Sequence, residues 1–363
     1  MSRTVKPDPE SAIPAHEPAH EPSHDYLARP YRLIGGPGSP YSMKMRAILR
    51  YRRLPFVWLQ RFMVEDSEFA HVVPQMIPYL YFPDEGVIRN DSTPLIYALE
   101  KRHSERSIVP SDPADAFLAH LVEDMADEWG TKIMYHYRWF YESDQVYYGP
   151  YLARGRFGAL PRAVAAKRGA DFRNRQVSRN TMVGATEQNR PIIEKSYRLV
   201  LDIFERQIEH CYYLFGTRPS LADFGWYGQL QPTEHAPIAG AIMREQAPAV
   251  WQWLQFLDDT SGVEGEWRDP QGPLSIAAKE LLDLAGTLYL PLLAANARSV
   301  LDGTDKVEIE ALGERYVQTP FKYQHKCWNW LLDELEAVQG EPRRRLQRIL
   351  EEAGCWRTLV DPL

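Results

Sequence analysis

The sequence has few cysteines, no long hydrophobic run and no excess of positive charge. Its three cysteines lie far apart among 363 residues and form no CxxC pair, which argues against a disulfide framework and a zinc ribbon. No apolar run approaches the roughly 20 residues that a membrane-spanning helix requires. A net charge of −7 argues against bulk binding of nucleic acid. We therefore expect neither a membrane nor a nucleic acid as a partner.

The start of the chain also lacks the basic and then apolar stretches of a secretory signal. Together with the reduced cysteines, this favours a cytoplasmic protein. Hydrophobic residues make up 44% of the sequence and charged residues 25%, which is typical of a soluble globular protein. A chain of this length is too long for one small core, so we expect two or three domains.

Residues 1–29 are rich in proline, histidine, glutamate and serine. Their apolar content is too low to offset the entropy of ordering, so we predict a flexible arm. His16, His20 and His24 could bind a metal ion there, but no helix aligns them, and a solvated linker is the favoured interpretation. No metal site is predicted.

Residues 30–103 alternate between strand and helix signals. We expect strands at 31–34 and 54–59, a hairpin of strands at 78–82 and 86–88, and helices at 43–53, 65–72 (weak) and 92–102. This order predicts a small mixed sheet with helices on its faces.

Residues 113–262 carry a helical pattern, and the box formed by Ser220 and Asp223 predicts a helix start. Within this region, residues 150–186 are rich in glycine and arginine, with eight basic residues and one acid between 154 and 179. We predict a mobile solvated loop there, with an anion-attracting lid as the alternative. Residues 263–363 form a C-terminal extension with a long helix at 275–301, a small hairpin at 307–317 and two closing helices.

The stretch from Gly38 to Arg46 combines a tight turn with the start of an amphipathic helix. A hydroxyl at this position, from Ser39 or Ser42, lies beside unpaired backbone N–H groups at the positive end of a helix dipole. Such a place favours an anion, and a thiolate is an anion.

Four segments together resemble the glutathione S-transferase family, and the resemblance covers about residues 30–260. They follow one another with family-like order and spacing: Ser39-Pro40-Tyr41-Ser42, Met76-Ile77-Pro78-Tyr79-Leu80, Asn90-Asp91-Ser92 and residues 216–224. The resemblance implies an α+β protein with a thioredoxin-like βαβαββα domain followed by an all-helical domain. It also implies glutathione as co-substrate and a homodimer.

The resemblance assigns Ser39 as the residue that stabilises the glutathione thiolate, and it places Tyr41 and Ser42 in the glutathione site. Ser42 is the alternative hydroxyl. Lys44 or Arg46 could neutralise the glycyl carboxylate, or both could be solvated helix positions.

The remaining glutathione contacts are expected from two further segments. A cis bond before Pro78 would turn the main chain of Ile77 outward, so that it pairs with an extended peptide. Asp91 can accept from the α-ammonium of glutathione, and the Ser92 hydroxyl and N–H suit its α-carboxylate.

A second substrate is expected between the domains. Tyr135, Arg138 and Trp139 could line its pocket, or the aromatic residues could be core packing. Serine instead of cysteine at position 39 favours conjugation, dehalogenation, ether cleavage or isomerisation over disulfide reduction. We therefore expect an enzyme that acts on a small hydrophobic or aromatic electrophile. The alternative is a non-catalytic binding or scaffold protein with this fold.

Overall fold

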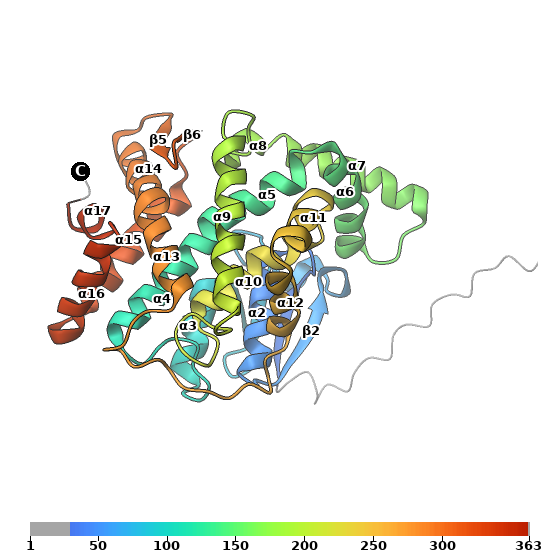
Figure 1. The fold of residues 1–363 in the computed structure, drawn as a ribbon. Coiled ribbons are helices and arrows are strands. Elements are labelled where there is room, and N and C mark those ends of the chain that lie inside the picture. The colour runs from blue at the N-terminus through green and yellow to red at the C-terminus, as the bar shows by residue number, and fades with distance from the viewer. Residues whose placement is uncertain (1–29, 362–363) are drawn as a thin grey trace, which may run out of the picture.

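The computed structural model describes residues 30–361 (Figure 1). The predicted arm at residues 1–29, with its three histidines, lies outside the described residues. The described chain forms a small sheet domain, a helical domain and a C-terminal extension, which confirms the predicted α+β class. None of the helices between residues 30 and 361 has the length and apolar character that crossing a bilayer requires.

The sheet has four strands in the order β2-β1-β3-β4. Strand β1 runs parallel to β2 and antiparallel to β3, and β3 pairs antiparallel with β4. The strands are β1 (Tyr31–Gly35), β2 (Phe56–Gln60), β3 (Tyr79–Phe82) and β4 (Val87–Asn90). Side chains alternate between the two faces, so Leu33 joins the main core while Ile34 joins a smaller cluster on the other face.

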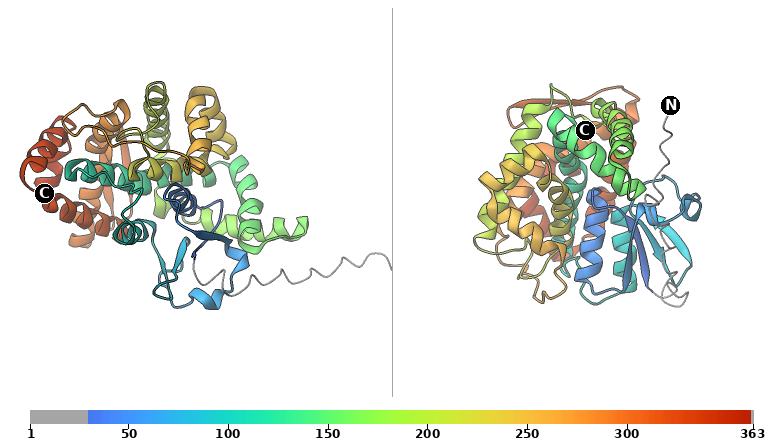
Figure 2. Two further views of the ribbon diagram at one scale, coloured as in Figure 1. Left: turned by 90° about the horizontal axis from the view of Figure 1, so that it is seen from below. Right: turned by 90° about the vertical axis from the view of Figure 1, so that its right-hand side faces the viewer.

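Helices α2 (Pro40–Tyr51) and α3 (Ser92–Arg102) cover the face of the sheet that meets the helical domain (Figure 2). The weak α-helix expected at 65–72 is not formed: this segment contains one 3₁₀ turn, Asp66–Phe69, and a second 3₁₀ turn, Arg61–Met63, precedes it. These short turns suffice to stack Phe69 on Tyr79, with 4.5 Å between ring centroids.

The helical domain begins with α4, which continues through a π-helical turn at Ala126–Gly130 into α5. Its helices are α4 (Pro113–Met125), α5 (Thr131–Trp139), α9 (Arg190–Ile208), α10 (Leu221–Glu234), α11 (Pro237–Gln246) and α12 (Pro248–Asp258). The predicted capping box at Ser220 and Asp223 starts α10. Gly228 lets α10 lie close to α2, because a Cβ atom there would approach the Cβ of Lys44 to 2.9 Å.

The loop predicted for residues 150–186 is wrong. The segment is helical, with α6 (Glu142–Phe157), α7 (Arg162–Val177) and α8 (Asn180–Val183). Alanine-rich sequence at the start of α7 favours a helix. The glycines serve a close helix contact and not a loop, because a Cβ on Gly169 would lie 2.6 Å from the backbone nitrogen of Pro150.

The C-terminal extension packs against α4 and α9, on the opposite side of the molecule from α6 and α7 (Figures 1 and 2). Its predicted hairpin and helices are present: α13 (Ile276–Leu284), α14 (Leu290–Asp302), β5 (Val307–Ala311), β6 (Glu314–Gln318), α15 (Lys322–Ala337), α16 (Gly340–Glu352) and α17 (Trp356–Val360). A π-helical turn at Ala285–Tyr289 joins α13 to α14.

A buried ion cluster joins the two domains. The Lys44 ammonium, on α2, donates to the carboxylates of Glu123 and Asp127, with 2.6 Å to Asp127 Oδ2. Lys44 is fully buried. Burial alone lowers the pKa of Lys44, but the attraction of Asp127 and Glu123 outweighs it and raises the pKa, so the ammonium remains charged.

Replacing this ammonium should destabilise the protein strongly. The substitution Lys44→Met leaves buried carboxylates without their countercharge, and we expect a loss of about 3–5 kcal/mol in the free energy of unfolding. Urea denaturation measures this loss. Lys279→Met removes an exposed lysine paired with Asp283 and should change the midpoint far less. Equal midpoints for Lys44→Met and the wild type would contradict a stabilising role for the cluster.

Candidate active site

Ser39 is the N-cap of α2, as the sequence predicts. Its backbone is extended, with φ −100° and ψ 119°, and Pro40 occupies the first helical position, where its missing N–H costs no hydrogen bond. The Ser39 hydroxyl oxygen accepts from the backbone N–H of Ser42 at 3.3 Å. Its proton remains available for donation to an anion near the helix terminus.

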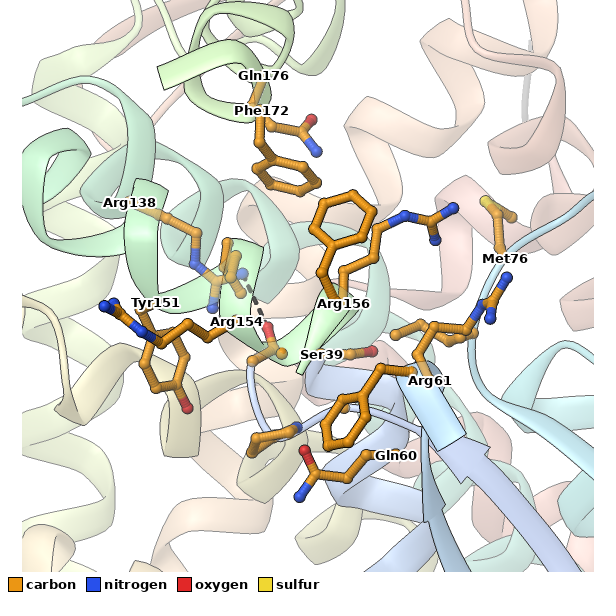
Figure 3. A pocket seen from close by; sticks show the side chains of 18 of the residues that line it. Ser39, Gln60, Arg61, Met76, Arg138, Tyr151, Arg154, Arg156, Phe172 and Gln176 are labelled. Carbon is orange, nitrogen blue, oxygen red and sulfur yellow. Dashed lines mark hydrogen bonds between the residues drawn. The ribbon is translucent and has the colours of Figure 1, made fainter. Parts of the chain in front are cut away.

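A cavity of about 1470 Å³ opens beside Ser39, between the sheet domain and the helical domain. Six of the predicted site residues line it: Ser39, Tyr41, Ile77, Tyr135, Arg138 and Trp139. Helices α6 and α7 complete its wall; Phe172 and Gln176 lie across the cavity from Gln60 (Figure 3). The cavity therefore brings the predicted thiolate position and the predicted substrate pocket into one space.

The turn before Ser39 is held from the helical domain. Arg138 Nη1 donates to the carbonyl oxygen of Gly38 at 2.9 Å (Figure 3). Gly38 also makes room for α6, because a Cβ there would lie 2.2 Å from Leu152 Cδ2. The Tyr41 hydroxyl donates to the backbone oxygen of Asp127 at 3.0 Å, which ties α2 to the π-helical turn.

Ser42 does not line the cavity. Its side chain is buried, and it packs so tightly on Gly35 that a Cβ at Gly35 would lie 2.5 Å from Ser42 Oγ. This placement favours Ser39 over Ser42 as the hydroxyl that meets a ligand. The peptide bond between Ile77 and Pro78 is cis, as predicted, and Ile77 reaches the cavity while Pro78 does not.

Asp91 occupies the N-cap position of α3, but its side chain forms no capping hydrogen bond with that helix. The carboxylate instead accepts from the Tyr323 hydroxyl at 2.8 Å and from the Lys326 ammonium at 3.2 Å. Both donors come from α15 in the extension. Ser92 is buried beside it, and neither Asp91 nor Ser92 lines the cavity.

Neither prediction for Lys44 and Arg46, as a partner of the glycyl carboxylate or as a solvated helix position, agrees with the structure. Lys44 lies in the buried cluster with Glu123 and Asp127, and Arg46 pairs with Asp258, so neither is a free solvated position or faces the cavity. Their partners come from helices more than 75 residues away along the chain. Local sequence therefore carries no signal of these pairs.

The arginines of the cavity wall were missed as site residues. Besides Arg138, the wall includes Arg61, Arg154, Arg156, Arg168 and Arg175. A signal did exist, in the eight basic residues and single acid between 154 and 179.

Tyr135, in the wall of the same cavity, is neutral, since burial raises its pKa to about 12. Its hydroxyl donates to the backbone oxygen of Gln176 at 2.8 Å.

Comparison with known families now identifies the class of protein. Residues 33–107 match the family model described as glutathione S-transferase, N-terminal domain, and residues 186–256 match the one described as glutathione S-transferase, C-terminal domain. The chain therefore carries an N-terminal and a C-terminal glutathione S-transferase domain, in this order. No curated protein matches the sequence.

Three of the solved structures to which this chain is similar are the following. A GST-like protein from Pseudomonas syringae is 16% identical, with 63% of this chain and 66% of that chain covered and a TM-score of 0.40. A glutathione S-transferase from Methylobacterium radiotolerans in complex with glutathione sulfonate is 18% identical (63% and 91% covered, TM-score 0.40). The beta-etherase LigF from Sphingobium sp. strain SYK-6 is 17% identical (70% and 98% covered, TM-score 0.41).

Proposed function

We propose that this protein is a glutathione-dependent transferase or lyase that acts in the cytoplasm. The Ser39 hydroxyl donates a hydrogen bond to the glutathione thiolate and thereby lowers the pKa of the thiol. The thiolate attacks an electrophilic carbon of an aromatic or other hydrophobic substrate. A carbon–sulfur bond forms and the leaving group departs with its electron pair. Conjugation, dehalogenation and ether cleavage share this step, and an isomerisation would add and later release the thiolate.

One observation carries this proposal: Ser39 is both the N-cap of α2 and part of the wall of the large cavity. The helix terminus supplies a positive dipole end and the hydroxyl supplies a donor. The cavity volume of about 1470 Å³ exceeds the range of about 300–1,000 Å³ that is usual for one small ligand. It leaves room for the tripeptide and a second substrate together.

A second candidate function is supported by Asp91. In the proposal this carboxylate receives the α-ammonium of glutathione, yet Lys326 already supplies an ammonium there. An ion pair between Lys326 and Asp91 that takes the place of the glutathione ammonium is compatible with a binding or scaffold protein that keeps the fold without turnover. The expected homodimer remains a prediction that rests on the family resemblance alone.

Removal of the Ser39 hydroxyl should separate these two functions. For Ser39→Ala, loss of one donor to the reacting sulfur should lower kcat/KM by about 10²- to 10³-fold. The assay follows glutathione conjugation over a panel of aromatic electrophiles, with glutathione binding measured by thermal shift.

The matched control is Ser275→Ala, which removes the N-cap hydroxyl of α13, an element that contributes no residue to the cavity. It loses a comparable cap, worth about 1 kcal/mol, and should keep full turnover. Glutathione binding without turnover in the wild type would favour the scaffold function. No glutathione binding at all would refute the transferase.

Lys326 gives a second test of the glutathione site. If the ligand ammonium must displace the Lys326 ammonium from Asp91, Lys326→Met should tighten glutathione binding by about two- to fivefold, the scale of an exposed ion pair. Titration calorimetry measures this, and the exposed Lys322 on the same helix provides the control Lys322→Met.

A glutathione analogue without the α-amino group should bind the wild type and Lys326→Met equally well. Weaker glutathione binding by Lys326→Met would show instead that Lys326 is part of the binding site.

A further inference from the structure

We propose that the second substrate is an aromatic compound that carries a carboxylate or another oxyanion, held by the arginines that line the cavity wall. The inference rests on the proposed function, in which this cavity holds the electrophile, and it adds the charge of that electrophile. Three independent features of the described residues support it: the charge of the wall, one buried arginine and two arginines beside one aromatic ring.

The wall of the cavity has a strong excess of positive charge. Six arginines line it against a single carboxylate, Asp171. The whole chain has the opposite balance, with 42 basic and 49 acidic residues, so the positive charge is concentrated at this site. A cleft with charge of one sign and low-dielectric walls attracts a ligand of the opposite sign.

Arg138 is the most deeply buried member of this set. Its side chain is only 6% exposed, and it forms no ion pair with any carboxylate of residues 30–361. Its Nη1 donates to the Gly38 carbonyl, but its Nε and Nη2 have no hydrogen-bond partner in the described chain. Buried charges in proteins are normally paired. The guanidinium lies over the Tyr148 ring, 4.5 Å from its centroid, but has no carboxylate partner in the described chain, so it provides a positive potential that an anionic ligand would neutralise.

Arg156 and Arg168 form the accessible part of the site. Both are exposed, and their guanidinium carbons lie 5.7 Å and 4.3 Å from the ring centroid of Phe157. Packing on the ring leaves the N–H forks available for an oxyanion, which they match in geometry. None of the eight basic residues between 154 and 179 pairs with a carboxylate within residues 30–361, whereas Arg53, Arg102 and Arg206 elsewhere on the surface do.

Arg61 brings a further positive charge toward the same space from the sheet domain (Figure 3). Its pKa is lowered first by burial and then by repulsion from Arg156. Arg61 pairs with Asp66, which leaves Arg156 as the uncompensated member. An oxyanion between the two domains would relieve this repulsion.

The aromatic part of the proposal follows from the rest of the wall. Ten aromatic side chains line the cavity, among them Tyr135, Trp139 and Phe172. Such rings stack on the flat faces of a ligand. An oxyanion bound by the arginines of α6 and α7 leaves the ring of the substrate to extend toward Ser39, where the thiolate attacks. The oxyanion positions the substrate and takes no part in the bond changes.

The test compares naphthalene-2-carboxylate with naphthalene-2-carboxamide, its neutral analogue, on the full chain without glutathione. Calorimetry should show the carboxylate binding about tenfold more tightly, the scale of one charge-assisted hydrogen bond. Raising the salt from low to high concentration should weaken only the carboxylate. The matching sulfonate and phosphate identify the preferred oxyanion.

The double variant Arg156→Gln with Arg168→Gln should abolish the difference between carboxylate and carboxamide. The matched control, Arg162→Gln with Lys167→Gln, removes the same two positive charges from neighbouring positions on α7 but touches no residue of the cavity wall, and it should keep the difference. Equal binding of carboxylate and carboxamide by the wild type would overturn the inference.

Retained selectivity in Arg156→Gln with Arg168→Gln would likewise overturn it. Because binding is measured without glutathione, either result leaves the Ser39 turnover test to decide the proposed function separately.

Discussion

The buried ammonium of Lys44 is the interaction on which the geometry of this protein depends. It sits on α2, one turn after Ser39, and reaches two carboxylates on and just after α4. A buried charge tolerates little movement, because any separation leaves ions in a low-dielectric interior. The pair therefore fixes α2 against the helical domain. The position of Ser39 relative to the cavity follows from it, together with the Tyr41 hydroxyl bond to Asp127.

Two regions of the chain, helices α6 and α7 and the C-terminal extension, contact different parts of the proposed site. Helices α6 and α7 add aromatic and positively charged wall beside Ser39, and the contact between Gly149 and Gly169 holds them together. The extension reaches the other end, where α15 engages Asp91. The first region forms part of the cavity wall, and the second supplies the hydrogen-bond and ion-pair partners of Asp91.

Much of the fold was predictable because it depends on local signals. The strands, the hairpin, α2, α3 and the capping box at Ser220 all follow from short-range hydrophobic periodicity and turn chemistry. The predicted loop at 150–186 failed for a physical reason. Glycine lowers helix propensity locally, but Gly149 and Gly169 permit α6 and α7 to pack closely against each other. The stabilisation from this packing requires a partner helix, which the local sequence pattern does not reveal.

The sequence by itself determined the family signature, the place of Ser39 at a helix start and the cis bond at Pro78, since each depends on residues that are neighbours in the chain. Only the tertiary structure decided which side chains meet across long separations. The side chain of Lys44 lies in the core with Glu123 and does not face a ligand. Asp91 contacts residues of α15, and Arg138 has no carboxylate partner in the described chain. Such pairings depend on how whole elements pack, and no local pattern encodes them.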